Sequence, residues 1–66
     1  MINYSVAYYE ECGDKLFAQG RMRESARAYD HAMRDCCALF ALRPDAWAHY
    51  KQLDAKYHAA VKAIPA

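Results

Sequence analysis

Cysteine and histidine are the residue types of this chain that could bind a metal ion. The six candidates are Cys12, His31, Cys36, Cys37, His49 and His58. Neighbouring residues on a helix point about 100° apart, so the two adjacent cysteines cannot easily chelate one ion together. The pairs His31–Asp35 and Asp54–His58 have the i,i+4 spacing that more often gives surface ion pairs. Structural zinc needs four ligands at recognisable spacings, and the sequence contains no such set. We therefore expect neither a metal nor any other cofactor.

Catalysis could use a cysteine with a histidine, or the adjacent carboxylates Glu10 and Glu11. Adjacent carboxylates on a helix diverge, and such acidic runs usually lie on a solvated face. A cysteine nucleophile needs a nearby base and a pocket, and a chain of 66 residues has little interior to spare for one. No group of residues meets the geometric requirements of a catalytic site. We therefore expect a protein that is not an enzyme.

A stripe of arginines is the strongest charged feature. Arg23, Arg27 and Arg34 share one face of a predicted helix, and Arg21 lies near its start. Asp30 interrupts the stripe, and the net charge of the chain is only +1. Phosphate binding normally requires a clustered excess of positive charge, so the pattern disfavours nucleic acid as the partner. An acidic protein partner remains open, as does a face that is merely solvated.

Cysteine count and hydropathy indicate where the protein works. The chain has three cysteines, an odd number, and no CxxC pair, so a secreted disulfide scaffold is disfavoured. We interpret them as reduced thiols of a cytoplasmic protein. The start of the sequence lacks the basic and apolar regions of a signal peptide. No segment approaches 18 uncharged apolar residues, so we expect no membrane span.

Apolar residues at steps of three and four predict a single all-α domain over 1–66, with three helices. The helices are expected at about 5–19, 22–42 and 45–63. Gly20 can take the left-handed conformation that closes the first helix. Pro44 disfavours helix at the residue before it, which should end the second. Asp45 suits the opening of the third helix, through its charge or as a cap.

Aromatic residues are 14% of the chain, and most of them fit the apolar stripes. Those predicted to lie in the core are Tyr9, Phe17, Tyr29, Trp47, Tyr50 and Tyr57. Tyr4 and Tyr8 lie off the main stripe of the first helix, and Phe40 competes with a neighbouring leucine for one inward position. Exposed tyrosines are favoured anchors at interfaces. These three residues are therefore candidates for contacts outside the chain.

Residues 36–42 are apolar on nearly every side of the predicted helix. Such a segment must be covered all round, by the third helix, by a second chain or by a partner. A domain this short buries only about 60% of the surface of its unfolded chain. Because 56% of its residues are hydrophobic, we expect surplus apolar surface that another molecule covers.

The first two predicted helices resemble a tetratricopeptide repeat over residues 6–33. That family places aromatic, Leu, Gly and Ala residues at fixed offsets, followed by a Pro. The matching positions are held by Tyr9, Cys12, Gly13, Leu16, Gly20, Ser25, Tyr29 and Ala32. Cys37 stands where the family has Pro, and repeat arrays need about three units to bury a core. The resemblance implies one antiparallel helical hairpin with a third packing helix, an outline that is also similar to the microtubule-interacting-and-transport domain.

Both resemblances imply binding of a peptide or protein. The leading hypothesis is a non-enzymatic protein-binding module, acting as an adaptor, a chaperone-like subunit or an inhibitor. One alternative is a self-associating structural module, a dimer that packs two copies of the second helix. Another is a small nucleic-acid or nucleoprotein binder of the accessory kind that phages encode. The residues predicted to contact the partner are Tyr4, Tyr8, Arg23, Arg27, Arg34, Cys37 and Phe40.

Overall fold

Three helices make up the described part of the chain, which confirms the all-α prediction. The computed structural model describes the backbone of residues 4–38 and 45–65, and the side chains of residues 6–38 and 45–65. Helix α1 spans Tyr4–Ala18, α2 spans Met22–Cys37 and α3 spans Ala46–Lys62. Residues 39–42, the end of the predicted second helix, lie outside the described residues.

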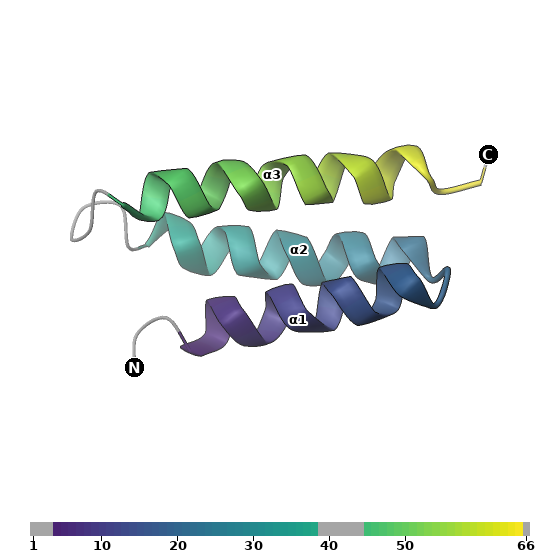
Figure 1. Ribbon diagram of the computed structural model, residues 1–66, viewed down its shortest axis with the longest axis horizontal. Coiled ribbons are helices and arrows are strands. Elements are labelled where there is room, and N and C mark those ends of the chain that lie inside the picture. The colour runs from purple at the N-terminus through teal and green to yellow at the C-terminus, as the bar shows by residue number, and fades with distance from the viewer. Residues whose placement is uncertain (1–3, 39–44, 66) are drawn as a thin grey trace.

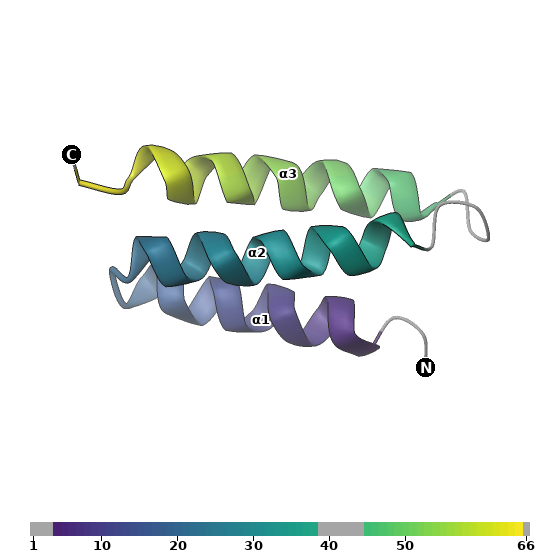
Figure 2. The ribbon, with the colours of Figure 1, turned by 180° about the vertical axis from the view of Figure 1, so that it is seen from behind.

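The helices lie side by side with α2 in the middle (Figure 1). The view from behind shows the same order, with successive helices antiparallel (Figure 2). Helices α1 and α3 each pack along α2 and approach each other much less closely. The principal extents are therefore unequal, at 38 × 19 × 13 Å. This arrangement makes α1 and α3 the two outer helices of a layer.

Gly20 closes the end of α1, as predicted. Its φ is +80°, a conformation that strains residues with a Cβ. The amide of Gly20 donates to the carbonyl of Phe17 at 3.0 Å, and the amide of Arg21 donates to Leu16 at 2.9 Å. These two bonds form a Schellman motif, which satisfies carbonyls that the helix end leaves without partners. The chain then turns directly into α2.

Small residues bring α1 and α2 together. Ser25 is fully buried, and its hydroxyl donates to the carbonyl of Gly13 at 2.8 Å. The Tyr29 ring fills the space beside Gly13, where an added Cβ would lie 2.6 Å from Cε1 of Tyr29. The two backbones can approach this closely because residue 13 has no side chain.

Helix α3 packs on the opposite side of α2 through small and branched residues. Leu53 and Ala60 are completely buried, and Ala46 is nearly so. The Cys36 thiol of α2 donates to the Ala46 carbonyl at 3.3 Å, which joins the last turn of α2 to the start of α3. Asp45 precedes α3 but makes no side-chain cap hydrogen bond. Of the two roles predicted for it, the structure therefore leaves only the favourable placement of its charge at the start of the helix.

The aromatic residues divide between core and surface. Tyr29 is buried, and Tyr9, Tyr50 and Tyr57 pack against the core while keeping part of their surface exposed. The core prediction was wrong for Trp47, which is 54% exposed, and for Phe17, which is 36% exposed. Trp47 lies in the first turn of α3 and Phe17 in the last turn of α1.

Candidate interaction site

An aromatic row crosses the outer surface of the α1–α2 hairpin. Tyr8 is 52% exposed, and its ring meets the edge of Tyr9 at a centroid distance of 5.3 Å. The Tyr9 ring then stacks on His31 of α2, at 4.9 Å with an interplanar angle of 18°. These contacts hold three rings in a fixed arrangement beside solvent, because two helices support them.

Arginines flank this row on α2. Arg27 and Arg34 are exposed and lie about one helical turn to either side of His31. Arg34 forms an ion pair with Asp30 at 3.1 Å, whereas no ion pair forms between Arg27 and any other described residue. We call the set Tyr8, Tyr9, Arg27, His31 and Arg34 the hairpin face.

The other predicted contact residues lie outside this set. Arg23 is exposed on the first turns of α2, and Cys37 is exposed at its last residue. Tyr4 is the first residue of α1, but its side chain lies outside the described residues, as does the whole of Phe40. Arg21, near the arginine stripe, is engaged by Glu24 through two hydrogen bonds of 2.6 and 2.8 Å. Of the predicted contact residues, the structure places Tyr8 against Tyr9, which stacks on His31, and it places Arg27 and Arg34 about one turn of α2 on either side of His31.

A second polar cluster, which the sequence did not predict, bridges α1 and α3. Glu10 lies between two groups of α3: its Oε1 is 2.8 Å from Nε2 of His49, and its Oε2 accepts from Nζ of Lys56 at 2.8 Å. Lys56 also donates to Asp14 at 3.2 Å. Tyr29 of α2 donates its hydroxyl proton to Asp14 at 2.5 Å. The cluster therefore connects all three helices.

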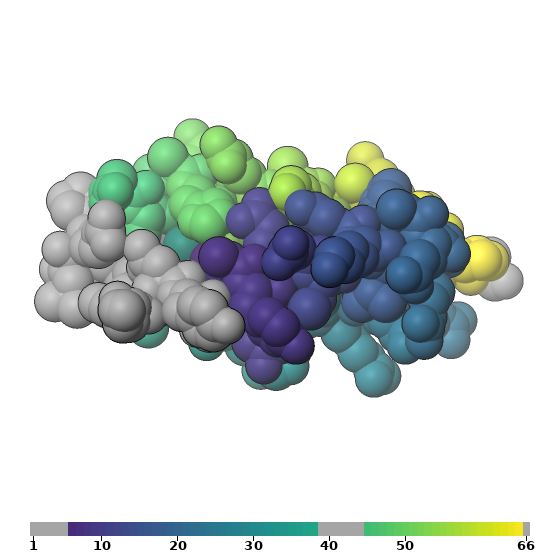
Figure 3. Space-filling model, turned by 60° about the horizontal axis from the view of Figure 1, so that its bottom comes forward, coloured from purple at the N-terminus to yellow at the C-terminus, as the bar shows by residue number. Residues whose placement is uncertain are grey.

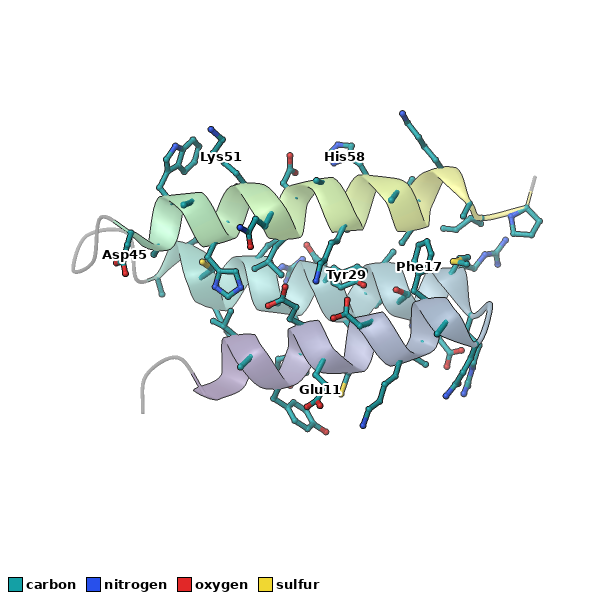
Figure 4. The ribbon with its side chains drawn as sticks, viewed as in Figure 1. Glu11, Phe17, Tyr29, Asp45, Lys51 and His58 are labelled. Carbon is teal, nitrogen blue, oxygen red and sulfur yellow. The ribbon has the colours of Figure 1, made fainter. Side chains whose placement is uncertain are left out.

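Figure 3 shows side chains of α1 (purple to blue) meeting those of α3 (green to yellow). In Figure 4, the Tyr29 side chain lies between these two helices, whereas Glu11 points away from them. A shallow pocket of about 170 Å³ lies next to the cluster, lined by Phe17, Tyr29, Lys56 and Ala59. Charged side chains thus bridge α1 and α3 in the middle of the layer, and a small apolar hollow adjoins them.

Interactions within the cluster stabilise the charged forms of Glu10 and Lys56 and the neutral form of Tyr29. Burial alone would raise the pKa of Glu10, but hydrogen bonds and charges from Lys56 and His49 outweigh it and lower that pKa. Burial would lower the pKa of Lys56, yet its bonds to Glu10 and Asp14 raise it. Burial, together with the hydrogen bond to Asp14 and its charge, raises the pKa of Tyr29 to about 12. The shifts follow from the same hydrogen bonds that join the three helices.

The cysteines and histidines do not converge. Cys36 is buried, Cys12 is half-buried and Cys37 is exposed, and none of the three forms a disulfide. Asp54 and His58 form an ion pair at the i,i+4 spacing noted in the sequence, at 3.3 Å. In the part of the chain that the structure describes, no group of three or more His, Cys, Asp or Glu residues could hold a metal. Nor is any helix there long and apolar enough to span a bilayer.

Comparison with known proteins gives no match to a family model, to a curated protein or to a solved structure. No relative therefore supports the resemblance to a tetratricopeptide repeat. What stands is a small all-α chain of three consecutively packed helices.

Proposed function

We propose that this chain is a non-enzymatic protein-binding module whose partner docks on the hairpin face. The observation that carries the proposal is the pairing of an exposed aromatic row with arginines on the same surface. Tyr8 is 52% exposed although it contacts Tyr9. A rigid, half-exposed tyrosine loses little conformational entropy when a partner covers it. Tyrosine and arginine are also the residue types enriched among those that carry most of the binding energy at interfaces.

The arginines specify the chemistry of the partner. A guanidinium group binds a carboxylate through two parallel hydrogen bonds, as Arg21 does with Glu24 within the chain. Arg27 has no such partner among the described residues, and the side chain of Arg34 is 75% exposed despite its ion pair. A protein surface that presents Asp or Glu side chains around an apolar patch fits this arrangement. In this proposal Arg23 extends the same contact along α2.

Acidic residues around the arginines disfavour nucleic acid. Asp30 binds Arg34 directly, and Glu24 and Asp35 lie on the same helix. A phosphate backbone would meet these carboxylates at nearly every turn of α2, and the chain as a whole carries only +1. A protein partner, which can place basic residues opposite them, meets no such repulsion.

The hairpin seam supports a tetratricopeptide-like arrangement as part of this proposal. Gly13, Ser25 and Tyr29 meet where α1 crosses α2, and Gly20 makes the turn between them. These are four of the positions on which the resemblance was based. The same spacing thus gives a close helix–helix contact in this chain, whatever its ancestry, and leaves the hairpin rigid enough to present a binding surface.

The test compares two variants with the same change of charge. Tagged wild-type protein, Arg27→Glu and Lys62→Glu are used to capture proteins from the cells that express the chain, with and without nuclease treatment. Lys62 is exposed at the end of α3, away from the hairpin face. We expect one partner, identified by mass spectrometry, to bind wild type and Lys62→Glu, and to bind Arg27→Glu at least about tenfold less tightly.

The captured partner is then purified, and its affinity for all three proteins is measured by calorimetry. The proposal is wrong if Arg27→Glu binds as tightly as wild type, if both variants lose binding equally, or if nuclease abolishes capture. Capture of no protein by any of the three would also count against it. Circular dichroism of each variant verifies that the helices remain intact.

A further inference from the structure

Helix α3 carries a second apolar stripe beside the one that it buries against α2. The buried stripe consists of Ala46, Leu53 and Ala60, seven residues apart. The second, which we call the outer stripe, follows steps of three and four along the chain. It comprises Trp47, Tyr50, Asp54, Tyr57 and Val61 of α3, and Ile64 in the turn that follows the last residue of the helix. Alternating steps of three and four are the a and d positions of a coiled coil, which face another helix.

The protein's own core uses only part of the outer stripe. Trp47 is 54% exposed and Val61 is 41% exposed. Tyr50 and Tyr57 pack against the core with one side of each ring and remain half-buried. Trp47 and Tyr50 stack at 5.8 Å, with planes 10° apart. Trp47 and Val61, two heptads apart, are thus large apolar side chains exposed on one helix, which is a feature that a partner helix covers.

Helix α3 is an outer helix of the layer, with α2 on one side only (Figure 1). Lys51 and His58 point away from α2 at the outer edge of α3 (Figure 4). The α3 residues that contact Glu10 of α1, His49 and Lys56, do not belong to the outer stripe, so a second helix laid along the stripe would meet α3 without displacing α1.

We propose that the outer stripe is the interface of an antiparallel dimer, formed by α3 of two copies of this chain. In an antiparallel pair, a positions of one helix lie opposite d positions of the other. Trp47 then lies opposite Ile64 of the second copy, and Tyr50 lies opposite Val61 of the second copy. Two-fold symmetry produces each contact twice. Trp47, Tyr50, Val61 and Ile64 thereby each meet an apolar residue of the same stripe.

The polar residue of the stripe sets the orientation. In the same register Asp54 lies opposite Tyr57 of the second copy, so its carboxylate accepts a hydrogen bond from that phenol, and the reciprocal bond forms across the axis. A parallel pair would place Asp54 against Asp54, where two carboxylates repel each other. Within one chain Asp54 already pairs with His58 at 3.3 Å, which holds its carboxylate at the helix surface. A single polar a position commonly fixes register and orientation in this way.

This complementarity is why we assign the surface to a second copy. A foreign helix would have to provide apolar residues at both ends of the stripe and a hydroxyl group opposite Asp54. A second copy of the outer stripe, running in the opposite direction, provides this pattern, with Tyr57 as the hydroxyl. The dimer differs from the one expected from the sequence, which packed the second helices, because the exposed surface of α2 is rich in charged residues. The proposal does not depend on the hairpin face.

Sedimentation velocity of the purified chain, from micromolar to millimolar concentration, tests the dimer. Trp47 is the sole tryptophan, so its fluorescence emission reports burial of the interface directly. We expect wild type to dimerise with a blue shift of that emission. Val61→Glu, on the outer stripe, should weaken dimerisation at least about tenfold and abolish the shift. Ala55→Glu adds the same charge at an exposed site of α3 outside the stripe, and it should dimerise like wild type.

A rescue experiment tests the antiparallel register. Combining Tyr50→Lys with Val61→Glu places opposite charges across both symmetric contacts, so dimerisation should return; a parallel pair would instead oppose like charges. A wild type that stays monomeric at millimolar concentration overturns the proposal, as does a Val61→Glu variant that dimerises as well as Ala55→Glu. Failure of the rescue, with helicity intact by circular dichroism, overturns the register. Binding of the hairpin-face partner by Val61→Glu is measured separately, so the two proposals can fail independently.

Discussion

The ring of Tyr29 lies directly against the backbone of Gly13, and a Cβ at residue 13 would come within 2.6 Å of its Cε1 atom. Tyr29 is 3% exposed and its hydroxyl is held by Asp14 at 2.5 Å, so a shift of the ring would strain that bond. Ser25, one helical turn before Tyr29 on α2, binds the Gly13 carbonyl. The spacing between α1 and α2 therefore depends on the absence of a side chain at this position.

Gly13→Ala should destabilise the protein for this reason. Alanine favours a helix interior by about 1 kcal/mol over glycine, but overpacking a tight contact costs about 1–3 kcal/mol. Since the two effects oppose each other, we expect a net loss of up to about 2 kcal/mol in the free energy of unfolding, measured by urea denaturation. In a Tyr29→Leu background the same substitution should become neutral or stabilising. An equal loss in both backgrounds would show that the Tyr29 ring is not the obstacle.

Residues 13, 20 and 29 could be placed from the sequence because helix contacts repeat at fixed spacing and Gly20 marks a turn. The same reasoning misplaced Trp47 and Phe17, since a helical stripe does not show where the neighbouring helix ends. Glu10 was interpreted as part of a solvated face. Its partners are 39 and 46 residues away in the chain, and only the packing of α1 and α3 on α2 brings them together. Local periodicity therefore predicts the hairpin, but it cannot predict a bridge between two helices that are not consecutive.

Glu10→Gln should remove a contribution to stability that wild type has at neutral pH and loses at acid pH. The pKa of Glu10 is lower in the folded protein than in the unfolded chain, so the unfolded state binds the proton more tightly. The stability contributed by the carboxylate is therefore fully present above its ordinary pKa, about 4.5, and is lost as the pH falls through the folded value. At pH 7 we expect the variant to lose about 1–2 kcal/mol in urea unfolding, as for a hydrogen bond to a charged group.

At about pH 2, below the ordinary pKa of a glutamate, the difference between Glu10→Gln and wild type should become small. Glu11→Gln is the matched control, because Glu11 is the adjacent residue and points into solvent. It should follow the wild-type curve within a few tenths of a kcal/mol at both pH values. If the two variants behave alike, Glu10 does not bridge the helices in solution.

Tyr29→Phe tests the alkaline side of the same cluster. The pKa of the phenol is raised from its ordinary value of 10 to about 12 in the folded protein, so the folded state holds this proton more tightly. The resulting stability is fully present below pH 10 and is lost as the pH rises through 12, an effect of up to about 3 kcal/mol. Wild type should therefore lose more stability than Tyr29→Phe over that interval. Part of the loss should persist in the variant, because Lys56, whose pKa is also raised, gives up its proton in the same range.

Tyr8→Phe, at an exposed ring, is the control and should decline as steeply as wild type. Parallel curves for wild type and Tyr29→Phe would mean that the hydroxyl bond to Asp14 does not hold the ring against Gly13.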